Sequence, residues 1–176
     1  MCSSDLYIAT KQYKSLKKYA NKHGVKIVGD IPIYVALDSA DVWTNQSVFQ
    51  LDSEHRPTKV AGVPPDYFSA TGQLWGNPLY DYEKMKENGF RWWKKRTEIC
   101  SGLFDVLRID HFRGMEAYWA VPYGDTTAIN GSWIKGPCMD LVNAIKKAGK
   151  GMDVIAEDLG FLTQEVKDLK AEANWP

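Results

Sequence analysis

The sequence has 176 residues, of which 44% are hydrophobic and 25% are charged, which is enough apolar material for one folded domain with a core. Its 22 basic residues balance 22 acidic residues, so charge gives no reason to expect a nucleic acid or a membrane as partner. Three scattered cysteines and three histidines without ligand spacing predict neither a disulfide framework nor a metal site.

The start of the sequence lacks an apolar run long enough for a signal peptide, and no run approaches the length of a membrane span. The odd number of dispersed cysteines favours a reducing compartment. The expected location is therefore the cytoplasm.

The first predicted element is a helix over residues 11–23, in which one face carries Tyr13, Leu16 and Ala20. The residues VKIVGD then predict a strand that ends at Asp30. The predicted domain covers residues 11–176, and residues 1–10 are left as an unassigned N-terminal end.

Residues 36–82 lack clear periodicity and are rich in Pro, Gly, Asp, Asn and Ser. Because so long an irregular connection is unusual in a compact domain unless it is functional, we interpret it as an insertion over the carboxyl-terminal face of a sheet. Residues 83–101 predict a helix, and its expected inward positions are Met85, Phe90, Trp93 and Ile99.

Two further strands are predicted at residues 104–110 and 152–157, separated by an aromatic, glycine-containing loop over 111–137 and a helix over 138–148. Thr163 is a candidate N-cap for a last helix. This βα order predicts a parallel sheet with right-handed crossovers. Since a (β/α)8 barrel needs eight strands and about 250 residues, about three strands predict a partial barrel.

Two carboxylates stand at the ends of predicted strands. FDVLRID ends in Asp110, and MDVIAED brings Glu157 and Asp158 to the matching position of the next strand. Barrel active sites lie at these strand ends, and two carboxylates there can cleave a glycosidic bond. Arg108 lies on the same side of its strand as Asp110 and would favour the ionised carboxylate. The alternative is that Asp110 caps a loop and Glu157 is a solvated acid before a helix.

Other residues could bind a sugar or support the site. Asp30 closes the first strand, where support of a loop is favoured over contact with a sugar hydroxyl. His111 could donate to a substrate hydroxyl or brace its loop. The irregular segment also carries Asp66, Tyr67, Phe68 and Trp75. Aromatic rings suit the apolar faces of sugars, although for each ring singly a local aromatic mini-core is the more common arrangement.

Several segments together resemble a known family. GVPPDYFSATGQLWGNPLYD, LRIDHFRG and IAEDLG are similar to the amylomaltases, which are the bacterial and plant 4-α-glucanotransferases also called disproportionating enzymes. GDIPIYVALDSADVW and FRGMEAYWAVP extend the likeness, which runs from about residue 11 to the end, whereas MCSSDL does not share it. The resemblance implies a central fragment of a (β/α)8 barrel of the α-amylase superfamily.

The resemblance implies roles for the positions that match family motifs. Asp110 matches the catalytic nucleophile, and Glu157 matches the general acid/base. Arg108 and His111 match residues around the −1 sugar, while Asp30 matches the acid at the end of the third barrel strand.

The irregular segment, by the same resemblance, is an inserted active-site loop region over residues 36–82. Tyr67 and Phe68 match a flexible loop over the acceptor side, with Asp66 beside them, and Trp75 matches an aromatic contact near that cleft. The family's third catalytic carboxylate and its N-terminal substrate-binding Tyr have no match in this sequence.

The expected activity is retaining transfer of α-1,4-glucan segments to glucose or a maltodextrin through a covalent glycosyl-enzyme, without a metal or cofactor. The expected substrates are maltooligosaccharides and chains derived from starch or glycogen. Two alternatives stay open, an α-amylase-type hydrolase and a non-catalytic glucan-binding module. The fragment by itself is expected to be inactive.

Overall fold

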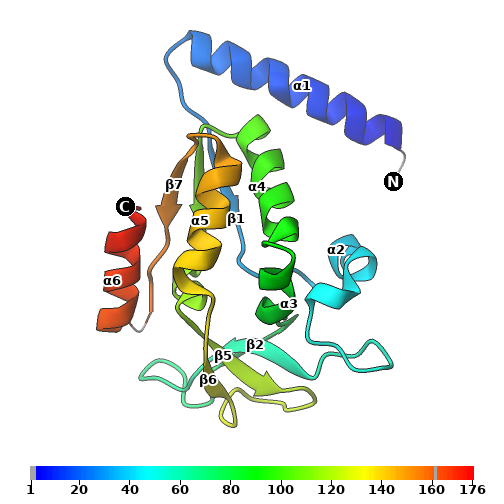
Figure 1. Ribbon diagram of the computed structural model, residues 1–176, viewed down its shortest axis with the longest axis vertical. Helices are drawn as coiled ribbons and strands as arrows, with labels where there is room; N and C mark the ends of the chain where they lie inside the picture. The colour runs from blue at the N-terminus through cyan, green and yellow to red at the C-terminus, as the bar shows by residue number, and fades with distance from the viewer. Residues whose placement is uncertain (1–2, 161) are drawn as a thin grey trace.

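The computed structural model describes residues 3–160 and 162–176 as a mixed α/β fold with two sheets (Figure 1). The first sheet is parallel, with the strand order β1 (Val28–Ile31), β4 (Val106–Ile109) and β7 (Asp153–Ala156). The second is antiparallel, with the order β3 (Gln73–Pro78), β2 (Lys59–Val63), β5 (Ala117–Pro122) and β6 (Ser132–Lys135).

Strand β4 is the middle of the parallel sheet, as expected for an apolar run that is covered on both faces. Leu107 and Ile109 are fully buried. The Asp110 amide donates to the Ile31 carbonyl at 2.9 Å, and the Glu157 amide donates to the Ile109 carbonyl at 3.1 Å. The three predicted strands are therefore confirmed as parallel neighbours that end at one edge.

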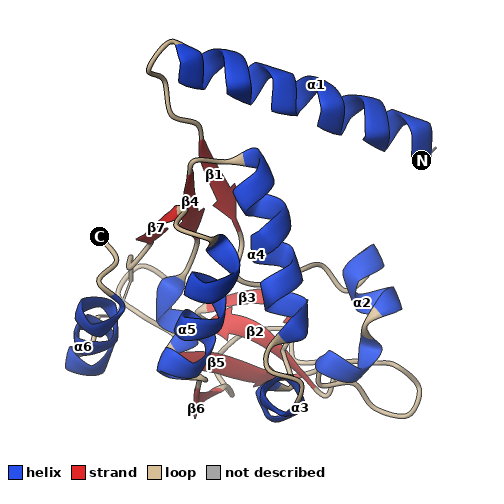
Figure 2. Cartoon of the chain, turned by 45° about the horizontal axis from the view of Figure 1, so that its top comes forward, coloured by secondary structure: helices blue, strands red, loops and turns tan. Residues whose placement is uncertain are grey.

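Helices α4 (Arg91–Leu103) and α5 (Cys138–Gly149) pack side by side against the parallel sheet (Figures 1 and 2). Helix α6 (Gln164–Ala173) follows β7, with Thr163 at its N-cap position as predicted. The side chains that join these helices to the sheet are fully buried: Trp93, Leu141, Ile145 and Val166. Hydrophobic burial of this kind is the main stabilising term of the fold.

The predicted helix over residues 83–101 is in fact two helices, α3 (Tyr82–Glu87) and α4. Gly89 and Phe90 both adopt the left-handed conformation, with φ of 66° and 57°, which ends α3 and turns the chain. Met85, Phe90 and Trp93 are buried as predicted. The inward position predicted for Ile99 was wrong, because Cys100 takes the buried side and Ile99 is 57% exposed.

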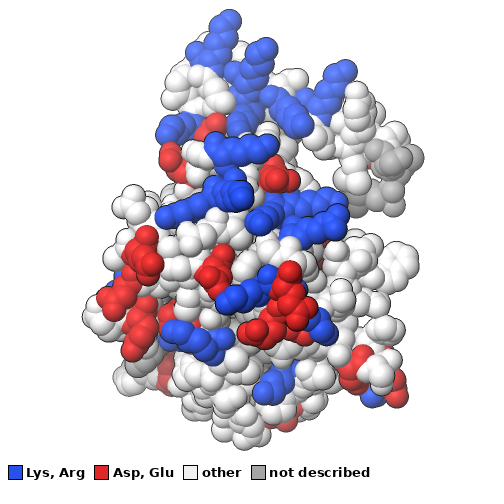
Figure 3. Space-filling view, in the orientation of Figure 1, with Lys and Arg blue, Asp and Glu red and all other residues white. Residues whose placement is uncertain are grey.

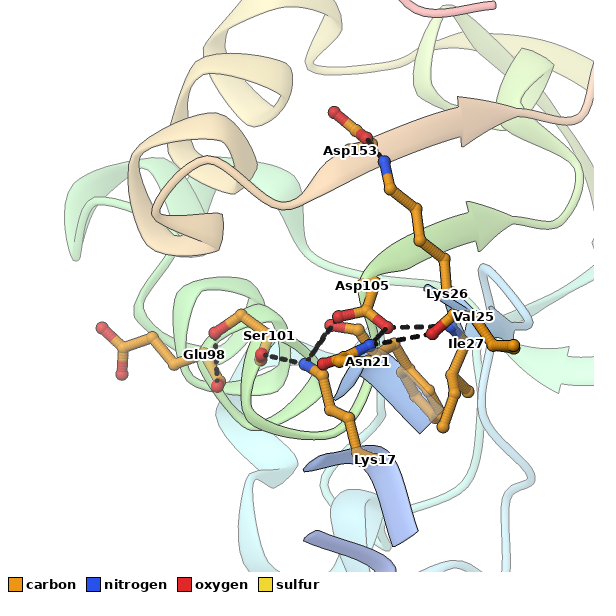
Figure 4. A network of polar contacts seen from close by, with 10 residues as sticks. Lys17, Asn21, Val25, Lys26, Ile27, Glu98, Ser101, Asp105 and Asp153 are labelled. Atoms are coloured by element: carbon orange, nitrogen blue, oxygen red, sulfur yellow. Dashed lines mark hydrogen bonds and ion pairs between the residues drawn. The ribbon is translucent and has the colours of Figure 1, made fainter. Parts of the chain in front are cut away.

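Helix α1 (Ser3–Lys22) begins well before the predicted start at residue 11 and extends away from the rest of the chain (Figure 1). It contacts the segment before β4 through the Tyr13 ring, which packs edge-on against Phe104, and through two hydrogen bonds. Lys17 donates to the Phe104 carbonyl at 2.7 Å, and Asn21 donates to Asp105 at 2.7 Å (Figure 4). Basic side chains gather at this end of the molecule (Figure 3). This network ties α1 to the start of β4, opposite the strand ends that carry Asp110 and Glu157.

Residues 36–82 are less irregular than predicted, since they form α2 (Ala40–Thr44), a short 3-10 turn (Gln46–Val48), β2 and β3. The predicted loop over 111–137 likewise contains β5, β6 and a 3-10 turn (Phe112–Met115). The resulting antiparallel sheet lies beyond the carboxyl ends of the parallel strands (Figures 1 and 2). Alternation did not predict β2, because Val60, Ala61 and Gly62 are buried in succession.

None of the helices in the described part of the chain has both the length and the apolar character that crossing a membrane requires.

Candidate active site

Arg108 joins carboxylates from the ends of all three parallel strands. Its Nη1 donates to Asp30 at 2.8 and 2.9 Å and lies 3.1 Å from Asp110 Oδ1, while its Nη2 lies 3.9 Å from Glu157 Oε1. The hydrogen bond to Asp30 raises the pKa of Arg108, and the charges of Asp30, Asp110 and Glu157 act in the same direction. The site is thus a permanent cation with three acids around it.

The adjacent acids of IAEDLG point in different directions. Asp158 accepts a hydrogen bond from Lys170 of α6 at 2.8 Å. Glu157 instead accepts from the His111 amide at 2.7 Å and from the Leu159 amide at 3.2 Å. The member of the pair that faces Asp110 is therefore Glu157. Its two hydrogen bonds also brace the loops on either side of it.

Asp110 and Glu157 line one cavity of about 260 Å³. The antiparallel sheet supplies the opposite wall, through Gly62, Val63, Gln73, Trp75 and Trp133. The side chain of Glu157 is only 11% exposed, whereas that of Asp110 is 48% exposed. A buried, hydrogen-bonded acid beside an accessible, ion-paired acid is an arrangement that allows the two carboxylates different roles. A retaining pair requires carboxyl groups roughly 5–6 Å apart, and this separation stays a prediction here.

His111 directly follows Asp110, and its backbone amide donates to Glu157. It adopts a left-handed conformation, with φ of 54°, which turns the chain sharply after β4. Its ring packs edge-on against Trp75 at 4.8 Å. Burial and, to a smaller extent, the Arg113 charge together lower the pKa of His111 to about 4, although Asp110 opposes the shift. The imidazole is therefore neutral near pH 7 and can exchange hydrogen bonds with a neutral ligand.

The predicted residues of the inserted segment do not all reach the cavity. Trp75 and Asp66 line it. Tyr67 and Phe68 are outside its lining, are 98% and 94% exposed and contact each other edge-on at 5.6 Å. Asp66 accepts the amides of Phe68 and Ser69 at 2.8 Å, which fixes the start of this turn. Sugar contacts by these residues stay predictions.

Gly72 closes the turn between β2 and β3. Its φ is 68°, and a Cβ at this position would lie 2.3 Å from the Val63 carbonyl oxygen. Only glycine therefore allows the tight approach that brings β3, and with it Trp75, over the cavity.

Arg113 and Trp133 also line the cavity and were not predicted from the sequence. The Arg113 guanidinium lies 3.8 Å from the centre of the Trp133 ring. Arg113 lies only three residues after Asp110 in the sequence, and this closeness could have marked it as a candidate site residue. Trp133 comes from β6, a strand that no periodic pattern predicted, and only its position in the segment GSWIKG suggested an exposed ring.

Known proteins resemble the chain throughout nearly its whole length. A family model described as 4-alpha-glucanotransferase matches residues 6–176. The 4-alpha-glucanotransferase of Clostridium butyricum is 55% identical over 94% of this chain, and that of Aquifex aeolicus is 52% identical over 93%. Each match covers 34% of the relative, so the chain spans about a third of the length of these curated relatives.

A solved structure shows the same architecture. The amylomaltase from Streptococcus agalactiae in complex with acarbose superposes with a TM-score of 0.89 at 43% identity, over 94% of this chain and 34% of that one. The family match covers the strands that carry Asp110 and Glu157 and the antiparallel sheet above them. The chain belongs to the 4-alpha-glucanotransferase family.

Proposed function

We propose that this chain is the central catalytic segment of a longer 4-α-glucanotransferase, in which Asp110 is the nucleophile and Glu157 is the general acid/base. The observation that carries the proposal is that both carboxylates line one cavity and both lie close to the Arg108 guanidinium, at 3.1 and 3.9 Å. The complete protein that contains this segment is called the full-length enzyme below.

In the first half of the reaction, an Asp110 oxygen attacks the anomeric carbon of an α-1,4-glucan. The bond from that carbon to the bridging oxygen breaks, and Glu157 gives its proton to this oxygen. The released chain leaves with a new 4-hydroxyl, and the donor remains as a covalent glucanyl ester of Asp110. Arg108 lies 3.1 Å from Asp110 Oδ1 and holds this carboxylate in place.

In the second half, the 4-hydroxyl of an acceptor sugar loses its proton to Glu157 and attacks the same carbon, which releases Asp110. Two inversions give net retention of the α configuration. His111, neutral near pH 7, is placed to hydrogen-bond a sugar hydroxyl, and Asp30 orients Arg108. The segment containing Asp66, Tyr67 and Phe68 is proposed to cover the acceptor, with Trp75 as a stacking ring.

The parallel sheet is proposed to be three strands of a (β/α)8 barrel, with residues 11–176 as its central part and residues 36–82 as an inserted active-site region. The parallel strand order β1-β4-β7 and the acids at the strand ends support this assignment. A cytoplasmic location is also proposed, since Cys100 and Cys138 are free thiols, as a reducing compartment would leave them.

The proposed substrates are α-1,4-glucans, including maltooligosaccharides and chains from starch or glycogen, with no cofactor, metal, nucleic acid or membrane involved. The bound acarbose in the Streptococcus agalactiae relative, an oligosaccharide analogue, supports a glucan ligand. A hydrolase would use the same two acids and water. A glucan-binding module would need the rings but not the converging acids, so the geometry favours catalysis.

The test of this function is incubation of the full-length enzyme with maltotriose. Transfer predicts release of glucose together with longer maltodextrins, measured by chromatography. Release of maltose and glucose without longer products would instead support the hydrolase, and binding without any product would support the module.

The isolated chain of residues 1–176 is expected to show no transfer under the same conditions. In the described residues β1 and β7 are the two outer strands of the parallel sheet, so neither is closed into a barrel. The control is the full-length enzyme at the same concentration. Longer maltodextrins from the chain alone, lost on Asp110→Asn, would show that the segment is self-sufficient.

Trp75→Ala in the full-length enzyme is expected to lower kcat/KM for maltotriose by about tenfold, because a stacked ring contributes roughly this much to binding. The melting temperature should change little, since the ring is over a third exposed. Trp43→Ala, which removes an exposed tryptophan ring outside the cavity lining, is the comparison and should leave kcat/KM nearly unchanged. A large fall in melting temperature with kcat/KM retained would assign Trp75 to an aromatic mini-core.

A further inference from the structure

Arg113 is a buried cation, and two of its guanidinium nitrogens have no hydrogen-bond partner within residues 3–160 and 162–176. It is 4% exposed, and its Nε and Nη1 atoms are buried without a hydrogen-bond partner. The guanidinium lies flat on Trp133, which holds it in place but satisfies no N–H group. Because unpaired buried donors are costly, such a group is expected to have a partner when the site is occupied.

Arg113 and Glu157 line the same cavity. Its burial lowers its pKa, and the carboxylates of Glu116 and Glu165 partly offset this effect. Glu165 belongs to α6, which follows the strand that carries Glu157. The His111 amide donates to Glu157, and the 3-10 turn that contains Arg113 begins at the next residue. Arg113 thus shares the cavity with Glu157 and belongs to a turn that begins beside the residue bonded to it.

The charges of the residues that line the cavity indicate which class of ligand Arg113 binds. The lining contains three acids, Asp66, Asp110 and Glu157, against the single cation of Arg113. A phosphate or another anion would be repelled by this surplus of negative charge. A neutral polyol would not be repelled, and its hydroxyl oxygens can accept hydrogen bonds from the Nε and Nη1 groups of Arg113. Trp75 and Trp133 on the opposite wall offer apolar faces to a sugar ring.

We propose that Arg113, held on Trp133, binds hydroxyl groups of the acceptor sugar and so directs its 4-hydroxyl toward Glu157. This inference rests on the proposed function, because Glu157 is the group that takes the proton of the acceptor. A sugar ring carries several hydroxyls at fixed spacing, so one can bind Arg113 while another faces Glu157, whereas water offers a single oxygen. The pair therefore favours transfer over hydrolysis.

The experiment measures the reaction with the donor and the reaction with the acceptor separately, in the full-length enzyme. α-Maltosyl fluoride serves as the donor, because fluoride release reports formation of the glycosyl-enzyme, and glucose is varied as the acceptor. Arg113→Met is expected to raise the glucose concentration for half-maximal transfer by about tenfold, as loss of a charge-assisted hydrogen bond predicts. Fluoride release without glucose should fall by less than about threefold.

Arg96→Met is the matched control. Arg96 also stacks on tryptophan rings, at 5.3 Å from Trp92 and 5.2 Å from Trp93, and also has a buried Nη1 without a partner, but it does not line this cavity. It should lower the melting temperature without changing the requirement for glucose. Arg113→Lys keeps the charge and loses the planar guanidinium, so it should raise the requirement by several-fold, and it replaces Arg113→Met if that variant does not fold.

Three results would overturn the inference while leaving the proposed function intact. The first is an unchanged glucose requirement in folded Arg113→Met or Arg113→Lys. The second is an equal loss of fluoride release and transfer, which would mean a structural or donor-side role. The third is competition of inorganic phosphate with glucose that occurs only when Arg113 is present, which would mean that Arg113 binds an anion. Absence of any glucose-dependent transfer in the unsubstituted enzyme would instead refute the proposed function itself.

Discussion

Asp110→Asn in the full-length enzyme is expected to lower glucan transfer by at least about four orders of magnitude, because the neutral amide cannot form the covalent intermediate. Asn has the shape of Asp and loses only the ion pair with Arg108 at 3.1 Å. The fold and the binding of maltooligosaccharides should therefore survive. The measurements are the initial rate with maltotriose and the dissociation constant for a longer maltodextrin.

Asp153→Asn is the control for this change, since Asp153 lies at the other end of the parallel sheet in an exposed ion pair with Lys26. An exposed pair of this kind contributes little, so both rate and stability should stay close to those of the unsubstituted enzyme. Transfer by Asp110→Asn above about one per cent of the original rate, in a preparation free of unsubstituted enzyme, would assign the nucleophile to another residue.

Glu157→Gln should lower transfer from maltotriose by about two to four orders of magnitude, because Gln can neither give a proton to the bridging oxygen nor take one from the acceptor. The Gln carbonyl can still accept from the His111 amide, which Glu157 now does at 2.7 Å, so the loop geometry is retained. With α-maltosyl fluoride as donor, fluoride release should fall much less, since fluoride leaves without a proton.

Asp158→Asn is the control, because it also removes an acid from this loop but leaves Glu157 in place. Asp158 pairs with Lys170 and does not line the cavity. It should retain most of the activity. Equal losses with maltotriose and with the fluoride donor in Glu157→Gln would mean that the residue positions the loops and does not transfer the proton.

The parallel sheet and its acids were predictable from the sequence because their signals are local. Strands β4 and β7 are short apolar runs, and Asp110 and Glu157 stand directly after them. Their convergence follows from parallel pairing alone, which aligns strand ends at one edge. The spacing of Arg108 and Asp110 likewise predicted the contact that the structure places at 3.1 Å.

The antiparallel sheet was missed because its pairing is nonlocal. Strand β2 pairs with β5, with Lys59 opposite Pro122 and Gly62 opposite Trp119, and no pattern within either segment encodes that partnership. Consequently Trp133 on β6 could not be placed at the cavity, and Arg113 had no visible stacking partner. The break at Phe90 was missed for a different reason, since a left-handed aromatic residue is rare.

The most direct test of the central claim, that Asp110 of this segment forms a covalent bond to the transferred glucan, is to trap that intermediate. The full-length enzyme is treated with 5-fluoro-α-D-glucosyl fluoride, digested at low pH and analysed by mass spectrometry of its peptides. We predict one added 5-fluoroglucosyl group on the carboxylate of Asp110, absent in Asp110→Asn. A label on Glu157 or on another residue, or rapid turnover with inversion of the anomeric configuration, would contradict this account.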